Sequence, residues 1–191
     1  MRISELSQRA GVPVPTIKYY LREGLLPPGT NRARTQADYT DDHVRRLRLI
    51  RTLIEVGGLA IADVHAVVAA VDDENLSLHA AFGVAHDAIT PRHGLGEPEE
   101  RAEAHRVVDG LIDAMGWQIR AECQARELLA DAVVMLARNG LQPSDVDLRQ
   151  AAEAAHMRAR TDVLAVPAGV PRSEAVEYIV IGTLATEVSA N

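Results

Sequence analysis

The sequence predicts an all-α protein with a small two-stranded β wing near its N-terminus. Apolar residues recur at a helical spacing of three or four along almost the whole chain of 191 residues. Glycine and proline interrupt this period at intervals that suit short helices. Residues 25–40 lack the period, and there two short extended arms flank a polar loop, which predicts the wing.

The first two helices form a helix-turn-helix pattern. The first helix is expected to begin near Ser4 as its N-cap and to end at Gly11. The second is expected to have Val14 as its N-cap and to run to about Glu23, where Gly24 stops it. Two short helices joined by such a turn suit a DNA-binding module.

The remaining elements are also helical. Thr40 is expected to cap a third helix that ends at residues 57–58, and a fourth carries an apolar stripe up to Val71. The acidic stretch at residues 72–75 predicts a domain boundary, so the domains expected are 1–71 and 72–191. Further helices are expected over about 76–89, from Pro98 toward Gly116, from there to residue 139, from Ser144 to about 164, and over 173–190.

Charge separates the two expected domains. Residues 1–71 hold ten Lys or Arg and seven Asp or Glu, whereas residues 72–191 hold ten Arg and twenty Asp or Glu. A basic head on an acidic body favours contact with a polyanion through the head alone. The single Cys123 excludes a disulfide framework within the chain, and the apolar runs are too short for a membrane span. We therefore expect a cytoplasmic protein.

The second helix has two unlike sides on a helical wheel. Ile17 lies on the aliphatic side, with Tyr20 in the core or at its edge, and Lys18, Tyr19 and Arg22 lie opposite. Cations neutralise phosphates, and a tyrosine hydroxyl donates to a phosphate oxygen. The alternative for this side is an ordinary solvated helix face. With the wing and the third helix included, the expected contacts with double-stranded DNA come from Thr16, Lys18, Tyr19, Tyr20, Arg22, Arg32, Arg34, Tyr39, Arg45 and Arg48.

The same stretch resembles a known family. The segments MRISELSQRAGVPVPTIKYYLREGLLPP and HVRRLRLIRTLIEVGGLAIADV, with Tyr39 between them, resemble the N-terminal domain of bacterial MerR-family transcription regulators over roughly residues 1–71. The resemblance implies a winged helix-turn-helix head, a helical dimerisation and effector domain, and a homodimer on an inverted repeat in a promoter. It also implies that the spacer is bent and untwisted so that RNA polymerase engages both promoter elements.

The acidic body offers no chemistry of its own. Its histidines and single cysteine give no catalytic constellation, and neither a metal nor another cofactor is expected. The large apolar residues Phe82, Met115 and Trp117 are candidates for an apolar cavity that binds a hydrophobic small-molecule effector, although such residues are more often simply core. The chain is thus not expected to be an enzyme.

Two other functions remain open at this point. One is a helical small-molecule-binding or protein-interaction module whose winged head does not bind DNA specifically. The other is an architectural DNA-binding protein without promoter specificity. A lack of salt-dependent binding to a duplex favours the first alternative over a regulator. A protected inverted repeat in a footprint favours a regulator over the second.

Overall fold

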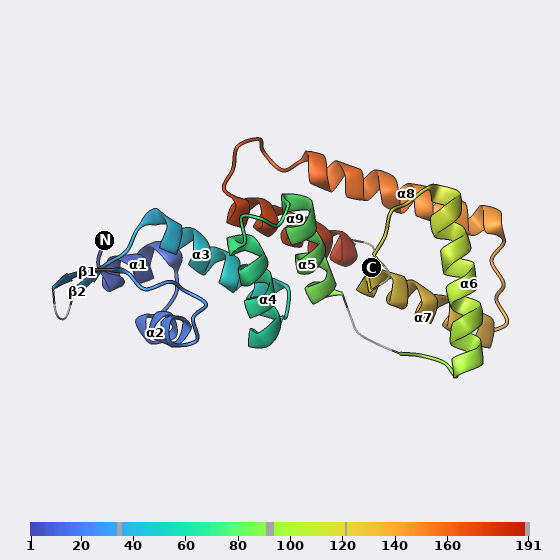
Figure 1. Cartoon of the computed structure of the whole chain (residues 1–191), viewed down its shortest axis with the longest axis horizontal. Coiled ribbons are helices and arrows are strands. Elements are labelled where there is room, and N and C mark those ends of the chain that lie inside the picture. Colours follow the sequence, from blue (N-terminus) through green and yellow to red (C-terminus); the bar gives the residue numbers. More distant parts are fainter. Residues whose placement is uncertain (34–35, 91–93, 121, 190–191) are drawn as a thin grey trace. The chain divides into compact units, whose positions relative to one another are not determined.

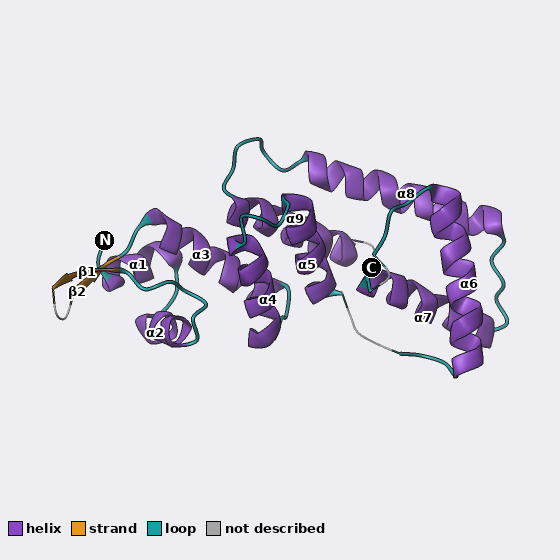
Figure 2. Cartoon of the chain, viewed as in Figure 1, coloured by secondary structure: helices purple, strands orange, loops and turns teal. Residues whose placement is uncertain are grey.

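The computed structural model describes the backbone of residues 1–33, 36–90, 94–120 and 122–189, with side chains except at 31–33, 36 and 184–189. It confirms the predicted all-α class: nearly all regular structure in these ranges is helical (Figure 2). The chain forms two compact units, one made of Met1–Ile89 with Val166–Asn191 and the other of Thr90–Ala165. The boundary between a DNA-binding and an effector domain that was expected after residue 71 stays a prediction. The boundaries of the compact units lie elsewhere, after residue 89 and before residue 166.

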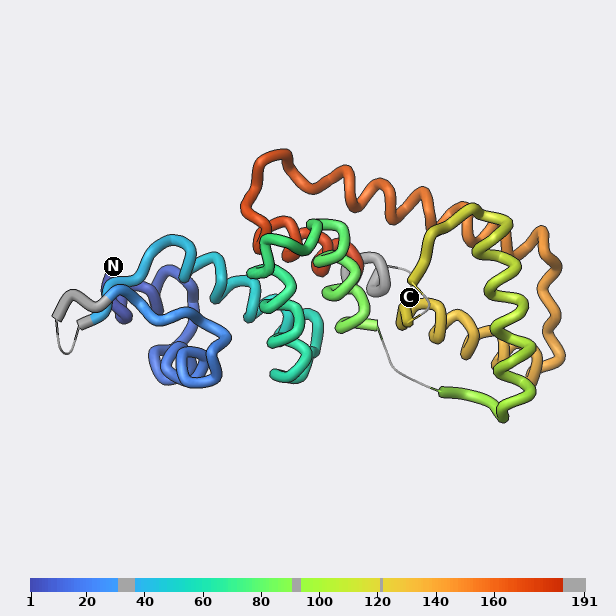
Figure 3. The backbone as a smooth tube through the Cα atoms, viewed as in Figure 1, coloured from blue at the N-terminus to red at the C-terminus, as the bar shows by residue number. Residues whose placement is uncertain are grey.

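The first unit contains both ends of the chain. Its C-terminal helix packs against helices from the first 89 residues, as the tube in Figure 3 shows. The elements of this unit, labelled in Figure 1, are α1 (Ile3–Ala10), α2 (Val14–Arg22), β1 (Thr30–Ala33), β2 (Gln36–Asp38), α3 (Asp41–Arg51), the π-helical turn η1 (Thr52–Val56), α4 (Ile61–Asp72), α5 (Leu78–Ile89) and α9 (Arg172–Ser189).

The starts of α1 and α2 differ slightly from those expected. Arg2 and not Ser4 is the N-cap of α1, because the Arg2 carbonyl already accepts the Leu6 backbone N–H at 2.9 Å. Pro13 and not Val14 is the N-cap of α2, since its carbonyl accepts the Ile17 N–H at 3.0 Å. Both helices therefore start at least one residue earlier than their side chains suggested.

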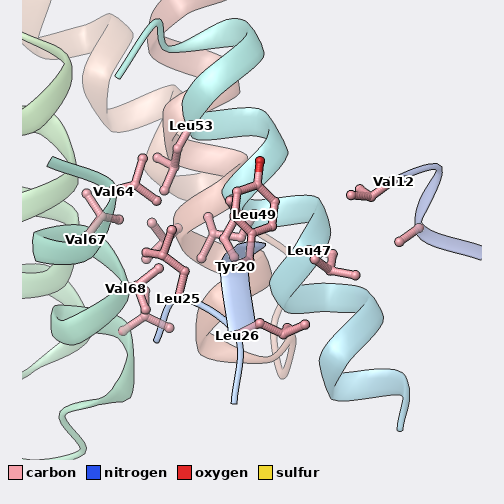
Figure 4. Packing of buried hydrophobic residues seen from close by; sticks show 14 of the residues in the cluster. Val12, Tyr20, Leu25, Leu26, Leu47, Leu49, Leu53, Val64, Val67 and Val68 are labelled. Atoms are coloured by element: carbon pink, nitrogen blue, oxygen red, sulfur yellow. The ribbon is translucent and has the colours of Figure 1, made fainter. Parts of the chain in front are cut away.

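One hydrophobic core joins the helices of the first unit. Residues from α2, the following loop, α3, η1 and α4 meet in it, as Figure 4 shows for Tyr20, Leu25, Leu49, Leu53 and Val64. Val176 and Val180 of α9 belong to the same cluster and are fully buried. Each buried aliphatic side chain of this size contributes about 1.5–3 kcal/mol through its removal from water. The C-terminal helix is therefore part of the support of the N-terminal helices.

The start of α3 is capped as predicted. Thr40 and His43 form a capping box, in which the Thr40 backbone N–H donates to Nδ1 of His43 at 3.1 Å. At its other end α3 continues into η1 before the chain turns at Gly57 and Gly58. The Thr52 hydroxyl in η1 donates to Oε1 of Glu177 at 2.8 Å, which ties this turn to α9.

The second unit is built from α6 (Pro98–Met115), α7 (Gln124–Arg138) and α8 (Asp145–Leu164). Its small core consists of Ala104 and Val108 from α6 with Ala130 and Val134 from α7. Ion pairs supplement it: Arg101 donates to the buried Asp131 at 3.0 Å, and to Glu127 at 2.6 Å. Similarly, bidentate hydrogen bonds from Arg138 lower the pKa of Glu100 to about 2.

Candidate nucleic-acid interface

The turn between α1 and α2 fixes the direction of α2. Gly11 has a left-handed φ of 66°, which suits glycine and ends α1. The Ser7 hydroxyl donates to the Val12 carbonyl at 2.6 Å, and the Val12 N–H donates back to the Ser7 carbonyl at 3.2 Å. Val12 itself is buried. The turn is thus held by hydrogen bonds on both sides and by an apolar anchor.

The inner side of α2 is anchored in the core. Ile17 is fully buried, and Tyr20 is only 8% exposed. The Tyr20 carbonyl accepts the backbone N–H groups of Leu25 and Leu26, whose side chains are also buried. The side chain of Tyr20 therefore lies on the inner face of α2 and not on its outer face. The ring of Tyr20 therefore supports α2 from within the core, and its contact with DNA stays a prediction.

The outer side of α2 carries the cationic and phenolic group that the helical wheel predicted. Lys18 and Arg22 are exposed, and Thr16 and Tyr19 are half-buried. The Arg22 guanidinium carbon lies 5.9 Å from the centre of the Tyr19 ring, within the range of a cation–π contact. α2 contains no acidic residue, and among the described residues no carboxylate lies within ion-pair distance of Lys18 or Arg22.

The predicted wing is present as a short antiparallel pair. Thr30 pairs with Asp38 and Asn31 with Ala37, followed by an irregularity before the Ala33–Gln36 pair. The backbone of Arg32 lies in β1, but its side chain is outside the description, as is all of Arg34. Their contacts with DNA stay predictions.

Tyr39, directly after β2, lies in the core and not on the surface. Its ring is 7% exposed and packs edge-to-face on the His43 ring at 5.1 Å between centres. Its backbone exchanges two hydrogen bonds with Met1, each 2.8 Å long. Tyr39 thus has a structural role, in which it fixes the N-terminus beside the wing, and its contact with DNA stays a prediction.

Burial also explains the shifted pKa values in this region. Removal from water raises the pKa of both Tyr20 and Tyr39 above 10.0, so both phenols stay neutral. Burial lowers the pKa of His43 below 6.5, which favours the neutral ring that accepts the Thr40 N–H.

Sequence reasoning overlooked two residues that hold this region together. The signal for Ser7 was a hydroxyl shortly before a glycine turn. The signal for His43 was its position three residues after a threonine cap.

The two arginines predicted on α3 lie beside carboxylates. Arg45 is half-buried and pairs with Asp42 one turn away, while Arg48 is exposed. Both line a cavity of about 300 Å³ between α3 and α9. The other residues of this cavity are Glu174, Glu177, Tyr178 and Ile181. The positive charge on α3 is thus partly offset by acidic residues within the same unit.

The three residues predicted to bind an effector belong to different compact units of the chain. Phe82 is half-buried on α5 and packs against the core of the first unit. Met115 and Trp117 belong to the second unit, where the Trp117 ring stacks on the His156 ring at 6.0 Å. The predicted effector contacts of these three residues stay predictions.

Metal-ligating clusters and membrane-spanning helices were both among the features that the sequence bears on. No cluster of three or more His, Cys, Asp or Glu side chains suited to a metal ion occurs in this part of the chain. None of the described helices is long and apolar enough to cross a membrane.

A helix-turn-helix that is anchored in a core, with a cationic outer face and an adjoining β wing, is typical of DNA-binding regulators of the helix-turn-helix class. Residues 1–71 match the family model of the MerR HTH family regulatory proteins. The chain is 28% identical over 133 residues to the HTH-type transcriptional regulator HmrR of Rhizobium leguminosarum bv. viciae, an alignment that covers 69% of this chain and 98% of that protein. Residues 1–71 are therefore a helix-turn-helix domain of the MerR family of transcriptional regulators.

Two further similarities agree with this assignment. The chain is 36% identical over 50 residues to the HTH-type transcriptional regulator ZntR homolog of Haemophilus influenzae, over 26% of this chain and 37% of that protein. It also resembles the crystal structure of SCO5550 from Streptomyces coelicolor A3(2), a protein proposed to be a transcriptional regulator. That similarity has a TM-score of 0.72 at 31% identity and covers 100% of this chain and 96% of the other.

Proposed function

We propose that this regulator binds double-stranded promoter DNA through the outer face of α2. The observation that carries the proposal is the group formed by Lys18, Tyr19 and Arg22, which is accessible, cationic and free of ion-paired carboxylates among the described residues. The buried anchor of Ile17 and Tyr20 holds this face in place. A fixed cationic helix face suits the regular phosphate spacing of a duplex.

Each side chain of the face has a distinct role in this proposal. Lys18 and Arg22 neutralise phosphates, and the Tyr19 hydroxyl donates a hydrogen bond to a phosphate oxygen. Thr16, near the start of α2, reaches a phosphate or a base edge. Arg32 and Arg34 are expected to contact the flanking backbone or minor groove. Because most of these contacts are to phosphates, recognition relies on DNA shape as well as on bases.

The protein acts, in this proposal, as a homodimer on an inverted repeat. Two copies place two α2 faces on successive turns of the duplex, as a palindromic operator requires. Bending and untwisting of the promoter spacer then regulates RNA polymerase indirectly, in the bacterial cytoplasm and at the nucleoid. A hydrophobic small-molecule effector remains part of the proposal, with Phe82, Met115 and Trp117 as its candidate contacts and Trp117 as the fluorescent reporter of its binding.

Salt-dependent duplex binding tests the proposed face. Footprinting on the DNA upstream of the protein's own gene is expected to show a protected inverted repeat. Lys18→Ala and Arg22→Ala are each expected to weaken binding to all sequences and to flatten the slope of log K against log salt by about 0.9. The matched control is Arg160→Ala, which removes an exposed arginine of α8 in the other unit.

The outcomes separate the alternatives. Salt-dependent binding without a protected repeat indicates an architectural DNA-binding protein. No salt-dependent binding to any duplex indicates a module that contacts protein or small molecules instead. A slope unchanged in both α2 variants refutes the assignment of this face, whatever the affinity of the wild-type protein.

A further inference from the structure

A second cavity lies within the second unit, between α6 and α8. Its volume is about 280 Å³, close to the lower end of the range of small-molecule sites. The cavity is bordered by apolar groups and by three charged groups. Its lining residues are Arg106, Val107, Gly110, Leu111 and Ala114 of α6 with Asp145, Leu148 and Arg149 of α8.

Gly110 is the least expected residue of this lining. It lies well inside the 18-residue helix α6, where glycine is less stable than alanine. A Cβ atom built at Gly110 meets no heavy atom within 4 Å, so no neighbouring group of the described chain requires glycine there. The missing side chain leaves open space along the wall of the cavity, so this wall can be approached closely by a molecule in the cavity.

The charged groups of the lining favour an anion. Arg106 and Arg149 oppose the single carboxylate of Asp145, which leaves one net positive charge. Arg106 pairs with Glu103 on its own helix, but this is an exposed pair of the kind that contributes little and rearranges readily. Arg149 is exposed and forms no ion pair among the described residues.

We propose that this cavity binds a small amphipathic anion. Its carboxylate or sulfonate group lies between the guanidinium groups of Arg106 and Arg149, and its apolar body packs against Leu111, Leu148 and the open surface at Gly110. The volume of the cavity suits an apolar body made of one or two aromatic rings or of a short aliphatic chain. This proposal rests on the second unit alone and does not depend on DNA binding by the first.

Fluorescence titration of the full chain with the anionic dye 1-anilinonaphthalene-8-sulfonate tests the charge of the site. Wild-type protein is expected to bind it saturably, and Arg106→Gln with Arg149→Gln is expected to lower the affinity about tenfold. Arg160→Gln, a matched change on α8 outside the cavity, is expected to leave the affinity unchanged. Equal affinity in the double variant and the control overturns the proposal.

A neutral dye of the same shape, N-phenyl-1-naphthylamine, separates charge from general apolar binding. It is expected to bind more weakly than the anionic dye and to respond little to the arginine changes. If the neutral dye binds as tightly as the anion, the assignment to an anion is wrong and the cavity is only an apolar surface.

Changes at Gly110 test the shape of the site. Gly110→Ala is expected to raise the midpoint of thermal unfolding by about 2 °C because alanine favours the helix, yet to weaken dye binding. Gly110→Leu fills the cavity and is expected to abolish binding. If both variants are folded, by circular dichroism, and bind the dye as wild type does, the cavity is not the site. Duplex binding is expected to be the same in all these variants, so failure here is distinguishable from failure of the proposed DNA contact.

Discussion

Helices α2 and α3 both carry cations predicted to meet DNA, and they differ in what surrounds those cations. On α2, Lys18 and Arg22 are exposed, and no carboxylate of the described residues pairs with either. On α3, Arg45 pairs with Asp42 on the same helix. The sequence shows the same kind of positive residue on both helices. On α2 both charges lie apart from carboxylates, whereas on α3 Arg45 is paired and Arg48 shares a cavity lining with Glu174 and Glu177.

The rest of α3 follows the same rule. Arg46 pairs with Asp72 at the end of α4, and Arg51 pairs with Glu55 one turn further on at 2.6 Å. Carboxylates of α9 approach from the other side, since Glu174 lines the same cavity as Arg48. Three of the four arginines of α3 therefore pair with carboxylates, and the pair of Arg46 links α3 to α4. We infer that α2 provides most of the electrostatic attraction to DNA.

The largest expected effect is the difference between two double variants. Lys18→Ala with Arg22→Ala is expected to lower duplex affinity about tenfold or more near physiological salt and to reduce the salt slope by about 2. Arg45→Ala with Arg48→Ala is expected to lower affinity less than about threefold and to change the slope by less than about 1. Fluorescence anisotropy with a labelled operator over a series of salt concentrations measures both. Equal losses in the two double variants contradict the comparison.

A smaller effect of opposite sign is expected from α9. Glu174→Gln with Glu177→Gln removes two negative charges beside Arg45 and Arg48 while leaving an oxygen that accepts the Thr52 hydroxyl. Duplex affinity is expected to rise about two- to fivefold, since the arginines then attract phosphates without competition.

A double-mutant cycle identifies the cause of that rise. When Arg45 and Arg48 are already alanine, the same glutamate changes are expected to have almost no effect. Glu153→Gln, an exposed change on α8, is the control for a general effect of net charge. An equal rise in the control and in the α9 variant shows that net charge alone is responsible.

The sequence predicted best what depends on neighbours along the chain. The two sides of α2 follow from the helical period, so the burial of Ile17 and the exposure of Lys18 were predictable. The caps of α3 and α8 at Thr40 and Ser144 were also predicted correctly, because a capping hydroxyl acts within three residues. The β wing was predicted from the loss of the helical period, and Tyr39 follows it directly.

What the sequence did not predict depends on distant contacts. Tyr39 was expected on the surface, but Met1 and His43 bury it. The return of α9 to the first unit places Val176 in a core formed largely by residues more than 100 positions earlier, and no local pattern specifies that pairing. The same return brings Glu177 to α3, so the reduced availability of its arginines could not be read from composition or charge.

The smallest predicted effect is a change of stability with pH, which is expected at the start of α3 and not on α2. Nδ1 of buried His43 accepts the Thr40 N–H only while the ring is neutral, and burial lowers its pKa below 6.5 in the folded state. The nearby Asp42 opposes this shift, and the N-terminal amine adds to it. In the unfolded chain the ring binds a proton near pH 6.5, so the unfolded state holds more protons below that pH. The stabilising contribution of neutral His43 is therefore complete above about pH 6.5 and is lost as the pH falls toward the folded pKa.

Urea unfolding of the wild type and of His43→Gln at pH 7.5 and pH 5.5 measures this contribution. Glutamine cannot be protonated in this range and retains an oxygen that can accept the Thr40 N–H, so the variant is expected to lose less stability on acidification than the wild type. Other titrating groups are common to both proteins and cancel in the comparison. A near-identical acid response in the two proteins means that His43 does not control the start of α3. A larger loss of stability in the wild type shows that acid weakens the start of α3 through His43. Helix α2 contains no histidine, so it lacks this route.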